Sequence, residues 1–165
     1  VKRAGDYTMG LSSLEKGSRV FVDGPYGRFT PDADEKQKLF IAGGIGITPF
    51  LSVLKDWEIK DLSFSAVLLW SVRFENELVD TAVLERIAAG NNGFSYRIFV
   101  TGESSSVYTK GRIGAGDIQG ALYSGAIKDT AVYICGPLPF MLSSKGMVIK
   151  AGVPKGNIFM ERFSS

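Results

Sequence analysis

The sequence of 165 residues contains no histidine and only one cysteine, Cys135. A single cysteine excludes an internal disulfide and a four-cysteine iron–sulfur cluster within this segment. The lack of histidine excludes a histidine-ligated haem and any triad or general base built on histidine. Metal chemistry is therefore not expected, and no residue is assigned as a metal ligand.

Long apolar runs and an excess of one charge are also absent. The 19 Lys and Arg and 17 Asp and Glu give a formal net charge of +2, without a basic run, so nothing indicates a nucleic-acid partner. The longest uncharged apolar stretch, residues 39–54, is shorter than the roughly 18 residues of a membrane span. No signal peptide is evident. With 45% hydrophobic residues, we expect one globular domain with a short appendage, and a small-molecule ligand.

Apolar runs alternate with amphipathic segments from residue 39 onward. Five strands alternating with four helices predict an α/β fold, a Rossmann-like three-layer sandwich around a five-stranded parallel sheet. The candidate strands are 39–43, 65–71, 95–101, 131–135 and 157–161, and the candidate helices are 48–57, 77–89, 115–124 and 138–151.

The residues before this alternation have a different character. Residues 1–30 contain a short apolar run at 19–22 and a GPYG turn, and they are interpreted as the end of an all-β domain. The polar segment 31–38 is interpreted as a linker, which leaves 39–165 as the nucleotide domain. Because the chain begins inside what reads as a strand, we expect it to be part of a longer protein.

The stretch 39–54, LFIAGGIGITPFLSVL, reads as a buried strand, a glycine turn and the start of a helix. Gly44 and Gly46 permit a sharp turn, Thr48 is expected to be the N-cap, and Pro49 suits the first helical position. The N–H groups and positive dipole end of such a helix favour a pyrophosphate. However, Pro49 replaces the third glycine of the G-x-G-x-x-G fingerprint, so a tight turn without a ligand is the alternative.

The second candidate strand ends at Arg73, without the acidic residue that usually accepts a hydrogen bond from an adenosine-ribose 2′-hydroxyl. An arginine can bind a 2′-phosphate through two charge-assisted hydrogen bonds, which favours NADPH over NADH. Glu75 can serve a 2′-hydroxyl, so NADH stays open. Lys110 and Arg112 are further candidates for the phosphate, and a surface charge is the alternative interpretation of each cation.

Five motifs occur in the order and approximate spacing of the ferredoxin-NADP reductase family. They are GPYGRF at 24–29, GGIGITPF at 43–50, WSVR at 70–73, YICGP at 133–137 and MERF at 160–163. Over nearly its whole length the chain resembles the nicotinamide-nucleotide half of these flavoenzymes. VKRAGDYT at 1–8 with VDGPYG at 22–27 is most similar to the ferric reductase and NADPH oxidase branch.

The resemblance implies an NAD(P)H-dependent, FAD-containing oxidoreductase, in which hydride passes from NADPH to FAD and electrons pass on to haem, iron or another acceptor. Residues 1–30 would then be the remnant of a β-barrel FAD domain. The implied partners are an upstream FAD-binding domain and either a haem-bearing membrane domain or an acceptor protein. We expect a cytoplasmic location, including as the cytosolic domain of a membrane protein.

The resemblance also implies roles for single residues. Cys135 would lie beside the nicotinamide and Thr48 would face the same ring, while Glu161 and Phe163 belong to the C-terminal motif, with Phe163 stacking near the flavin. The implied NAD(P)H contacts are Gly43, Gly44, Gly46, Ile47, Thr48, Pro49, Ser71, Arg73, Gly102, Lys110, Arg112, Cys135, Gly136 and Pro137. The implied FAD contacts are Gly5, Thr8, Tyr26 and Phe163.

Two alternatives stay open. One is a soluble flavin reductase that donates electrons to a partner protein, and the other is a nucleotide-binding regulatory module without turnover. The family's flavin motif, arginine-x-aromatic-serine/threonine, does not occur in the chain and is expected upstream of Val1. We therefore expect this chain alone to lack both flavin and reductase activity.

Overall fold

The computed structural model describes residues 10–21, 29–34, 37–122 and 127–162. The chain divides into two compact units, and the larger one is Phe29–Phe163. In the smaller unit, the described residues 10–21 contain one 3₁₀ turn, η1 (Leu11–Ser13), and no strand. The barrel remnant expected over residues 1–30 therefore stays a prediction. Gly5, Thr8, Tyr26 and Phe163 lie outside the described residues.

The larger unit is built on one parallel sheet with the strand order β4-β3-β2-β1-β5-β6. The strands are β1 (Gln37–Gly43), β2 (Ala66–Val72), β3 (Phe94–Val100), β4 (Thr109–Lys110), β5 (Thr130–Gly136) and β6 (Ile158–Arg162). The prediction of five strands was wrong by one, since the sheet has six. The missed strand, β4, has only two residues, which is too short to produce a periodic pattern in the sequence.

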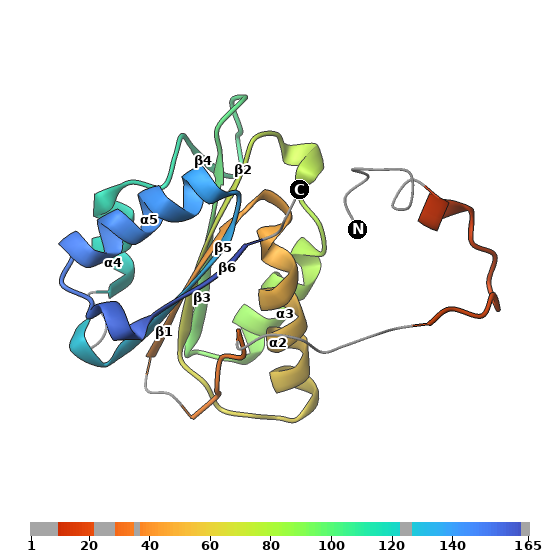
Figure 1. Ribbon diagram of the computed structural model, residues 1–165, viewed down its shortest axis with the longest axis horizontal. Helices are drawn as coiled ribbons and strands as arrows, with labels where there is room; N and C mark the ends of the chain where they lie inside the picture. The colour runs from red at the N-terminus through yellow and green to blue at the C-terminus, as the bar shows by residue number, and fades with distance from the viewer. Residues whose placement is uncertain (1–9, 22–28, 35–36, 123–126, 163–165) are drawn as a thin grey trace. The chain divides into compact units, whose positions relative to one another are not determined.

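Helices cover both faces of the sheet, which confirms the predicted three-layer arrangement (Figure 1). α2 (Thr48–Ile59) and α3 (Thr81–Gly90) lie on one face, and α4 (Ala115–Leu122) and α5 (Leu138–Lys150) lie on the other. Every residue of β1 and β5 is buried. Because both faces of these central strands are covered, they read in the sequence as continuous apolar runs.

Part of the predicted linker belongs to the folded unit. Gln37 and Lys38 form the first residues of β1, two positions before the predicted start. The Lys38 side chain is fully buried; its Nζ donates a hydrogen bond to the Ala33 carbonyl oxygen at 3.0 Å and lies 5.4 Å from the centre of the Trp57 ring. The Phe29 ring packs against the same core. The domain limits proposed from the sequence stay a prediction.

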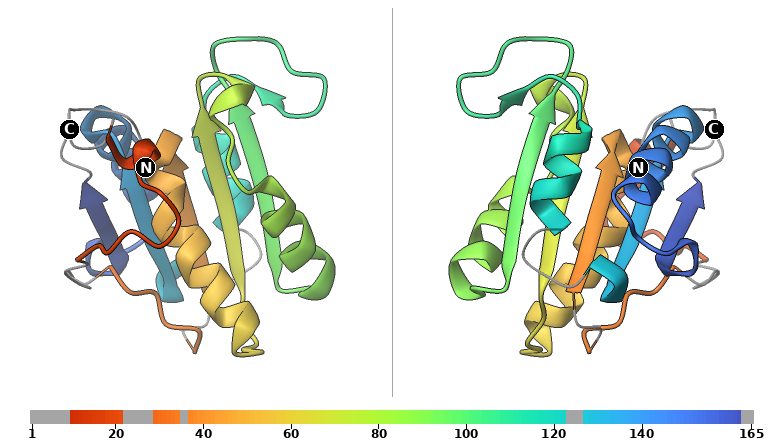
Figure 2. Two further views of the ribbon diagram at one scale, coloured as in Figure 1. Left: turned by 90° about the vertical axis from the view of Figure 1, so that its right-hand side faces the viewer. Right: turned by 90° about the vertical axis from the view of Figure 1, so that its left-hand side faces the viewer.

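The order in which the chain adds strands to the sheet reverses between β1 and β5. From β1 the chain builds β2, β3 and β4 outward on one side, and it then returns to place β5 and β6 on the other side (Figure 2). The carboxyl ends of β1 and β5 are therefore neighbours, while the connections that leave them go to opposite faces. Such a topological switch point is where ligands bind in open parallel sheets.

Candidate functional site

The turn after β1 passes very close to the end of β5. It forms a 3₁₀ turn, η2 (Gly44–Ile47), in which Gly44 has a φ of +54°. A Cβ atom on Gly46 would lie 2.3 Å from the Cys135 carbonyl oxygen, and a Cβ on Gly43 would lie 2.7 Å from the Phe140 ring. A side chain at Gly46 would meet backbone atoms and would force η2 and β5 apart, so glycine is favoured at this contact.

The start of α2 differs from the prediction. Thr48 was expected to be the N-cap, but its φ of −59° and ψ of −43° are helical, and the N-cap position belongs to Ile47, which makes no side-chain cap. The preceding 3₁₀ turn causes this shift, and the Thr48 hydroxyl donates to the Ile45 carbonyl oxygen at 3.1 Å. The amino-terminal end of α2 thus lacks a capping side chain and suits an anion above the glycine turn.

A tryptophan from the next strand fixes the glycine turn. Trp70 of β2 is fully buried, and its Nε1–H donates to the Gly44 carbonyl oxygen at 3.0 Å. The register pairs Gly43 with Ser71, which is half-buried beside this turn. The WSVR motif therefore supplies a structural contact to the turn in addition to its predicted nucleotide contacts.

Cys135 lies near the carboxyl end of β5, in register with Ala42 of β1 and Glu161 of β6. Its side chain is fully buried. Burial is the main cause that raises the pKa of the Cys135 thiol to about 12; the negative charge of Glu161 adds to it, and a backbone hydrogen bond from Gly136 opposes it. The thiol is thus protonated at neutral pH, so Cys135 is suited to shaping a site and not to nucleophilic attack.

Gly136 and Pro137 connect β5 to α5. Gly136 has a φ of +153°, and a Cβ atom there would lie 3.1 Å from the Cα of Gly43. Pro137 is the N-cap residue in an extended conformation, and α5 starts at Leu138, the position predicted from the sequence.

Arg73 lies at the carboxyl end of β2, in an exposed position. Its guanidinium carbon is 5.1 Å from the centre of the Phe74 ring, a cation–π contact. Its carbonyl oxygen accepts a hydrogen bond from the Gly102 N–H at 2.7 Å, and its own N–H donates to a Glu77 carboxylate oxygen at 2.8 Å. The backbone of Arg73 is therefore fixed, while its cationic group is open to solvent.

Lys110 and Arg112, the two other predicted phosphate ligands, lie near the same end of the sheet as Arg73, where the strands end. The register aligns Val72, Val100 and Lys110 across β2, β3 and β4. Lys110 is exposed and its Nζ donates to the Ser104 hydroxyl at 3.2 Å, and Arg112 is exposed shortly after β4. The cations thus gather toward β4, and the Cys135 region lies toward β6.

The structure places all the predicted NAD(P)H contacts at one end of the sheet, where the carboxyl ends of the strands lie. Sequence reasoning missed the Trp70 contact to the turn and the carboxylates of Glu77 and Glu103, which accept backbone hydrogen bonds after β2. The WSVR motif was a signal for Trp70. No pattern pointed to the two glutamates. The residues at this end are Gly43, Gly44, Gly46, Ile47, Thr48, Pro49, Ser71, Arg73, Gly102, Lys110, Arg112, Cys135, Gly136, Pro137 and Glu161.

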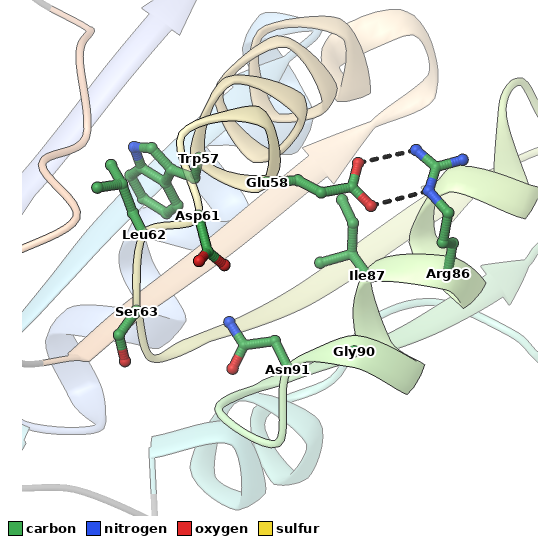
Figure 3. A pocket seen from close by; sticks show the side chains of 9 residues that line it. All are labelled: Trp57, Glu58, Asp61, Leu62, Ser63, Arg86, Ile87, Gly90 and Asn91. Atoms are coloured by element: carbon green, nitrogen blue, oxygen red, sulfur yellow. Dashed lines mark hydrogen bonds and ion pairs between the residues drawn. The ribbon is translucent and has the colours of Figure 1, made fainter.

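A pocket of about 410 Å³ lies at the opposite end of the sheet, where the strands begin, between the last turns of α2 and α3 (Figure 3). Glu58 and Arg86 face each other across it and form two hydrogen bonds of 2.8 Å. It contains none of the predicted site residues. Among the residues that the structure describes, no group of three or more Cys, Asp or Glu is arranged to hold a metal ion, and no helix has the length and apolar character needed to cross a bilayer.

The fold and the site are typical of one class, the α/β nucleotide-binding domains, with a glycine turn and an uncapped helix start at the switch point of the sheet. Residues 40–145 match the family described as the oxidoreductase NAD-binding domain. The chain belongs to this family. The resemblance drawn from the motifs is thereby confirmed for the NAD-binding domain, whereas the ferric reductase and NADPH oxidase branch is not distinguished.

Similar proteins have this domain as one part of a longer chain. The chain is 29% identical to the toluate 1,2-dioxygenase electron transfer component of Pseudomonas putida, across 94% of this chain and 46% of that protein. It is 30% identical to flavohemoprotein A of Dictyostelium discoideum, across 92% of this chain and 37% of that protein. The chain thus spans less than half the length of these two curated relatives.

A solved structure shows the same fold. The cytochrome b5 reductase domain of Ulva prolifera nitrate reductase superposes with a TM-score of 0.80 at 24% identity, across 95% of this chain and 64% of that one. This similarity supports the parallel sheet with helices on both faces.

Proposed function

We propose that this domain binds NAD(P)H and positions the nicotinamide for hydride transfer to FAD held by an upstream domain, from which electrons pass to haem, iron or another acceptor. The observation that carries the proposal is the contact of Gly46 with the Cys135–Gly136 backbone. This contact would hold the proposed phosphate cradle beside the proposed nicotinamide position, within a chain of the NAD-binding family.

The residues present fit a dinucleotide. A Cβ atom on Gly44 would meet nothing within 4 Å, so the turn leaves open space beside the uncapped start of α2, where a pyrophosphate would be held. Thr48 and Cys135, at the ends of η2 and β5, would flank the nicotinamide. The bound nicotinamide supplies the hydride; the protein supplies alignment and a dry environment and does not need an acid or base.

Glu161 and Phe163 complete the proposed nicotinamide side. Glu161 is half-buried and in register with Cys135, so its charge is held near the end of β5. We propose that Phe163 stacks near the flavin and that Gly5, Thr8 and Tyr26 contact FAD. These four roles rest on the motif resemblance alone.

The longer protein to which this domain is proposed to belong has more than one candidate. The ferric reductase and NADPH oxidase branch is favoured by the VKRAGDYT and VDGPYG motifs, with a haem-bearing membrane domain as partner and a cytoplasmic position for this domain. The names of the two relatives favour the alternative, a reductase that serves an oxygenase or a haem domain. A regulatory module without turnover is disfavoured because both Cys135 and Phe163 are retained.

We propose NADPH as the preferred cofactor, because Arg73 presents an exposed guanidinium on a fixed backbone. Wild-type protein is expected to bind NADP⁺ more tightly than NAD⁺. Arg73→Ala is expected to lower NADP⁺ affinity by about 10- to 100-fold, since a hydrogen bond to a charged group contributes roughly 1.5–3 kcal/mol. NAD⁺ affinity is expected to stay within about twofold, because NAD⁺ has no 2′-phosphate. Isothermal titration calorimetry measures all four affinities.

A matched control removes another exposed arginine. Arg97 lies on β3 and pairs with Asp117 of α4, away from the nucleotide end of the sheet. Arg97→Ala changes the net charge equally and is expected to leave both affinities unchanged. Equal loss of NADP⁺ and NAD⁺ affinity in Arg73→Ala would contradict the 2′-phosphate role, and a wild-type protein that binds neither nucleotide would refute the proposed function.

A further inference from the structure

The loop after β2, residues 73–77, has carboxylates bound to two of its backbone amides. The Arg73 N–H donates to a Glu77 carboxylate oxygen at 2.8 Å, and the Glu75 N–H donates to a Glu103 carboxylate oxygen at 2.6 Å. Glu103 belongs to a different loop, the one that follows β3. Both loops lie at the carboxyl ends of their strands (Figure 2).

Each of these carboxylates is hydrogen-bonded to the backbone of the loop. Charge-assisted hydrogen bonds to backbone amides are short and strong compared with neutral ones. The bond from the Gly102 N–H to the Arg73 carbonyl oxygen ties the same two loops together, and Gly102 packs directly on Arg73 and Phe74. The carboxylate of Glu77 therefore lies against the backbone of Arg73, and that of Glu103 lies against the backbone of Glu75, two residues along the same loop.

This arrangement opposes the attraction that Arg73 exerts on a phosphate. The amides of Arg73 and Glu75 already donate to carboxylates, so they are not available to a phosphate oxygen. A phosphate brought to Arg73 would also enter the repulsive field of nearby like charges. A ribose 2′-hydroxyl is neutral and can donate a hydrogen bond to a carboxylate, so it avoids this repulsion.

We infer that Glu77 and Glu103 are specificity-determining residues that weaken the binding of a nucleotide 2′-phosphate at Arg73 without weakening the binding of a 2′-hydroxyl. This inference rests on the proposed function and adds a determinant of its nucleotide preference. Arg73 favours NADPH, the two glutamates reduce that preference, and the balance between them sets how far the domain discriminates between the two nucleotides.

The test uses Glu77→Gln, Glu103→Gln and the double variant. Glutamine keeps a side-chain oxygen that can accept the same backbone hydrogen bond, so the variants remove charge without removing the acceptor. Glu85→Gln on α3 is the matched control, since Glu85 interacts electrostatically with Tyr96, near the start of β3. NADP⁺ and NAD⁺ affinities are measured by calorimetry for all five proteins, at low and at high salt.

Each single variant is expected to bind NADP⁺ about two- to fivefold more tightly than wild type, as for one exposed charge interaction. NAD⁺ affinity is expected to change less than about twofold, and the gain for NADP⁺ should shrink at roughly 1 M salt because surface charges are screened there. Glu85→Gln should change neither affinity. Because the glutamates come from different loops, either single variant carries the test if the other fails to fold.

Two results would overturn this inference and leave the proposed function standing. One is an unchanged NADP⁺ affinity at low salt in the variants that fold, and the other is an equal loss of NADP⁺ and NAD⁺ affinity. The second result would show that the carboxylates only support the loop. Absence of binding of either nucleotide to wild type would instead refute the proposed function, and the inference with it.

Discussion

Cys135 is the only cysteine in the sequence, and its burial decides what it can do. Its thiol has a pKa raised to about 12, mainly by burial, from an ordinary value of 9.0. A thiol in that state is a weak nucleophile but a compact apolar group that fits beside a planar ring. The residue is therefore suited to set the position of a ligand and not to react with it.

The first residue-scale prediction concerns the reactivity of this thiol. At pH 8, a neutral alkylating reagent is expected to label native Cys135 roughly 1000-fold more slowly than the urea-unfolded chain, because a three-unit rise in pKa reduces the thiolate fraction by that factor. Mass spectrometry measures the labelling directly, since no other thiol competes. Labelling of the native protein at the unfolded rate would show an exposed thiolate and would remove the basis for the positioning role.

The same shift predicts a change of stability with pH. Above about pH 9 the unfolded chain loses the thiol proton while the folded chain retains it up to about pH 12. The folded state then binds more protons, so the free energy of unfolding falls as pH rises through this window, and the contribution is fully present below it. In urea titrations, the wild type is expected to lose stability relative to Cys135→Ala as pH rises above about 9, within the window that ends at about pH 12. A constant difference would contradict the raised pKa.

At the scale of elements, the contact between η2 and β5 holds the candidate site together. Gly46→Ala is expected to destabilise the protein by about 1–3 kcal/mol, as overpacking does, because its Cβ would lie 2.3 Å from the Cys135 carbonyl oxygen. It should also lower nucleotide affinity by about tenfold or more, since η2 and β5 would be forced apart. Thermal unfolding and calorimetry measure the two effects.

A second glycine substitution is the control. Gly120 lies in α4, and a Cβ atom there would meet nothing within 4 Å. Gly120→Ala is therefore expected to stabilise the protein by about 0.5–1 kcal/mol through helix propensity, with unchanged nucleotide binding. If both alanines had the same effect, the close approach of Gly46 to β5 would not be what stabilises the site.

The elements that the sequence predicted well are those with buried, regular patterns. β1, β2, β3, β5 and β6 each start within two residues of the predicted position. The start of α3 was placed at residue 77 but is at Thr81, because Glu75–Glu77 form the 3₁₀ turn η3 and Asp80 has a φ of +52°. Irregular backbone of this kind leaves no periodic signal.

The candidate site was predicted unevenly for a similar reason. The glycines and Cys135 were found because local turns and strand ends are visible in a short window of sequence. The contacts of Trp70 with Gly44 and of Glu103 with the loop after β2 join residues 26 and 28 positions apart. Such contacts depend on strand order, which one sequence does not specify residue by residue.

At the scale of the whole molecule, the unit Phe29–Phe163 has a complete core. Apolar clusters fill the space between the sheet and the helices on both faces. The Phe29 ring contacts Phe50 of α2 and Tyr133 of β5, with centroid distances of 5.5 and 5.4 Å, which anchors the start of the unit against these two elements. In the described part of the other unit, Val20 and Phe21 are 56% and 95% exposed. Nucleotide binding is therefore expected to depend on the larger unit.

The last prediction follows from this difference between the two units. The 165-residue chain, expressed by itself, is expected to bind nucleotide but to purify colourless and to show no saturable binding of added FAD. The residues of the proposed phosphate cradle all belong to the larger unit, whereas flavin binding is expected to depend on a motif that the sequence does not contain. Calorimetric titration with NADP⁺ and with FAD, together with the visible absorption spectrum, measures both properties on one preparation. Nucleotide binding without flavin binding would support the proposal that these 165 residues hold the nucleotide site and that the main flavin contacts come from another domain. A stoichiometric yellow complex would instead place the flavin contacts within these 165 residues and would require the domain boundary to be redrawn.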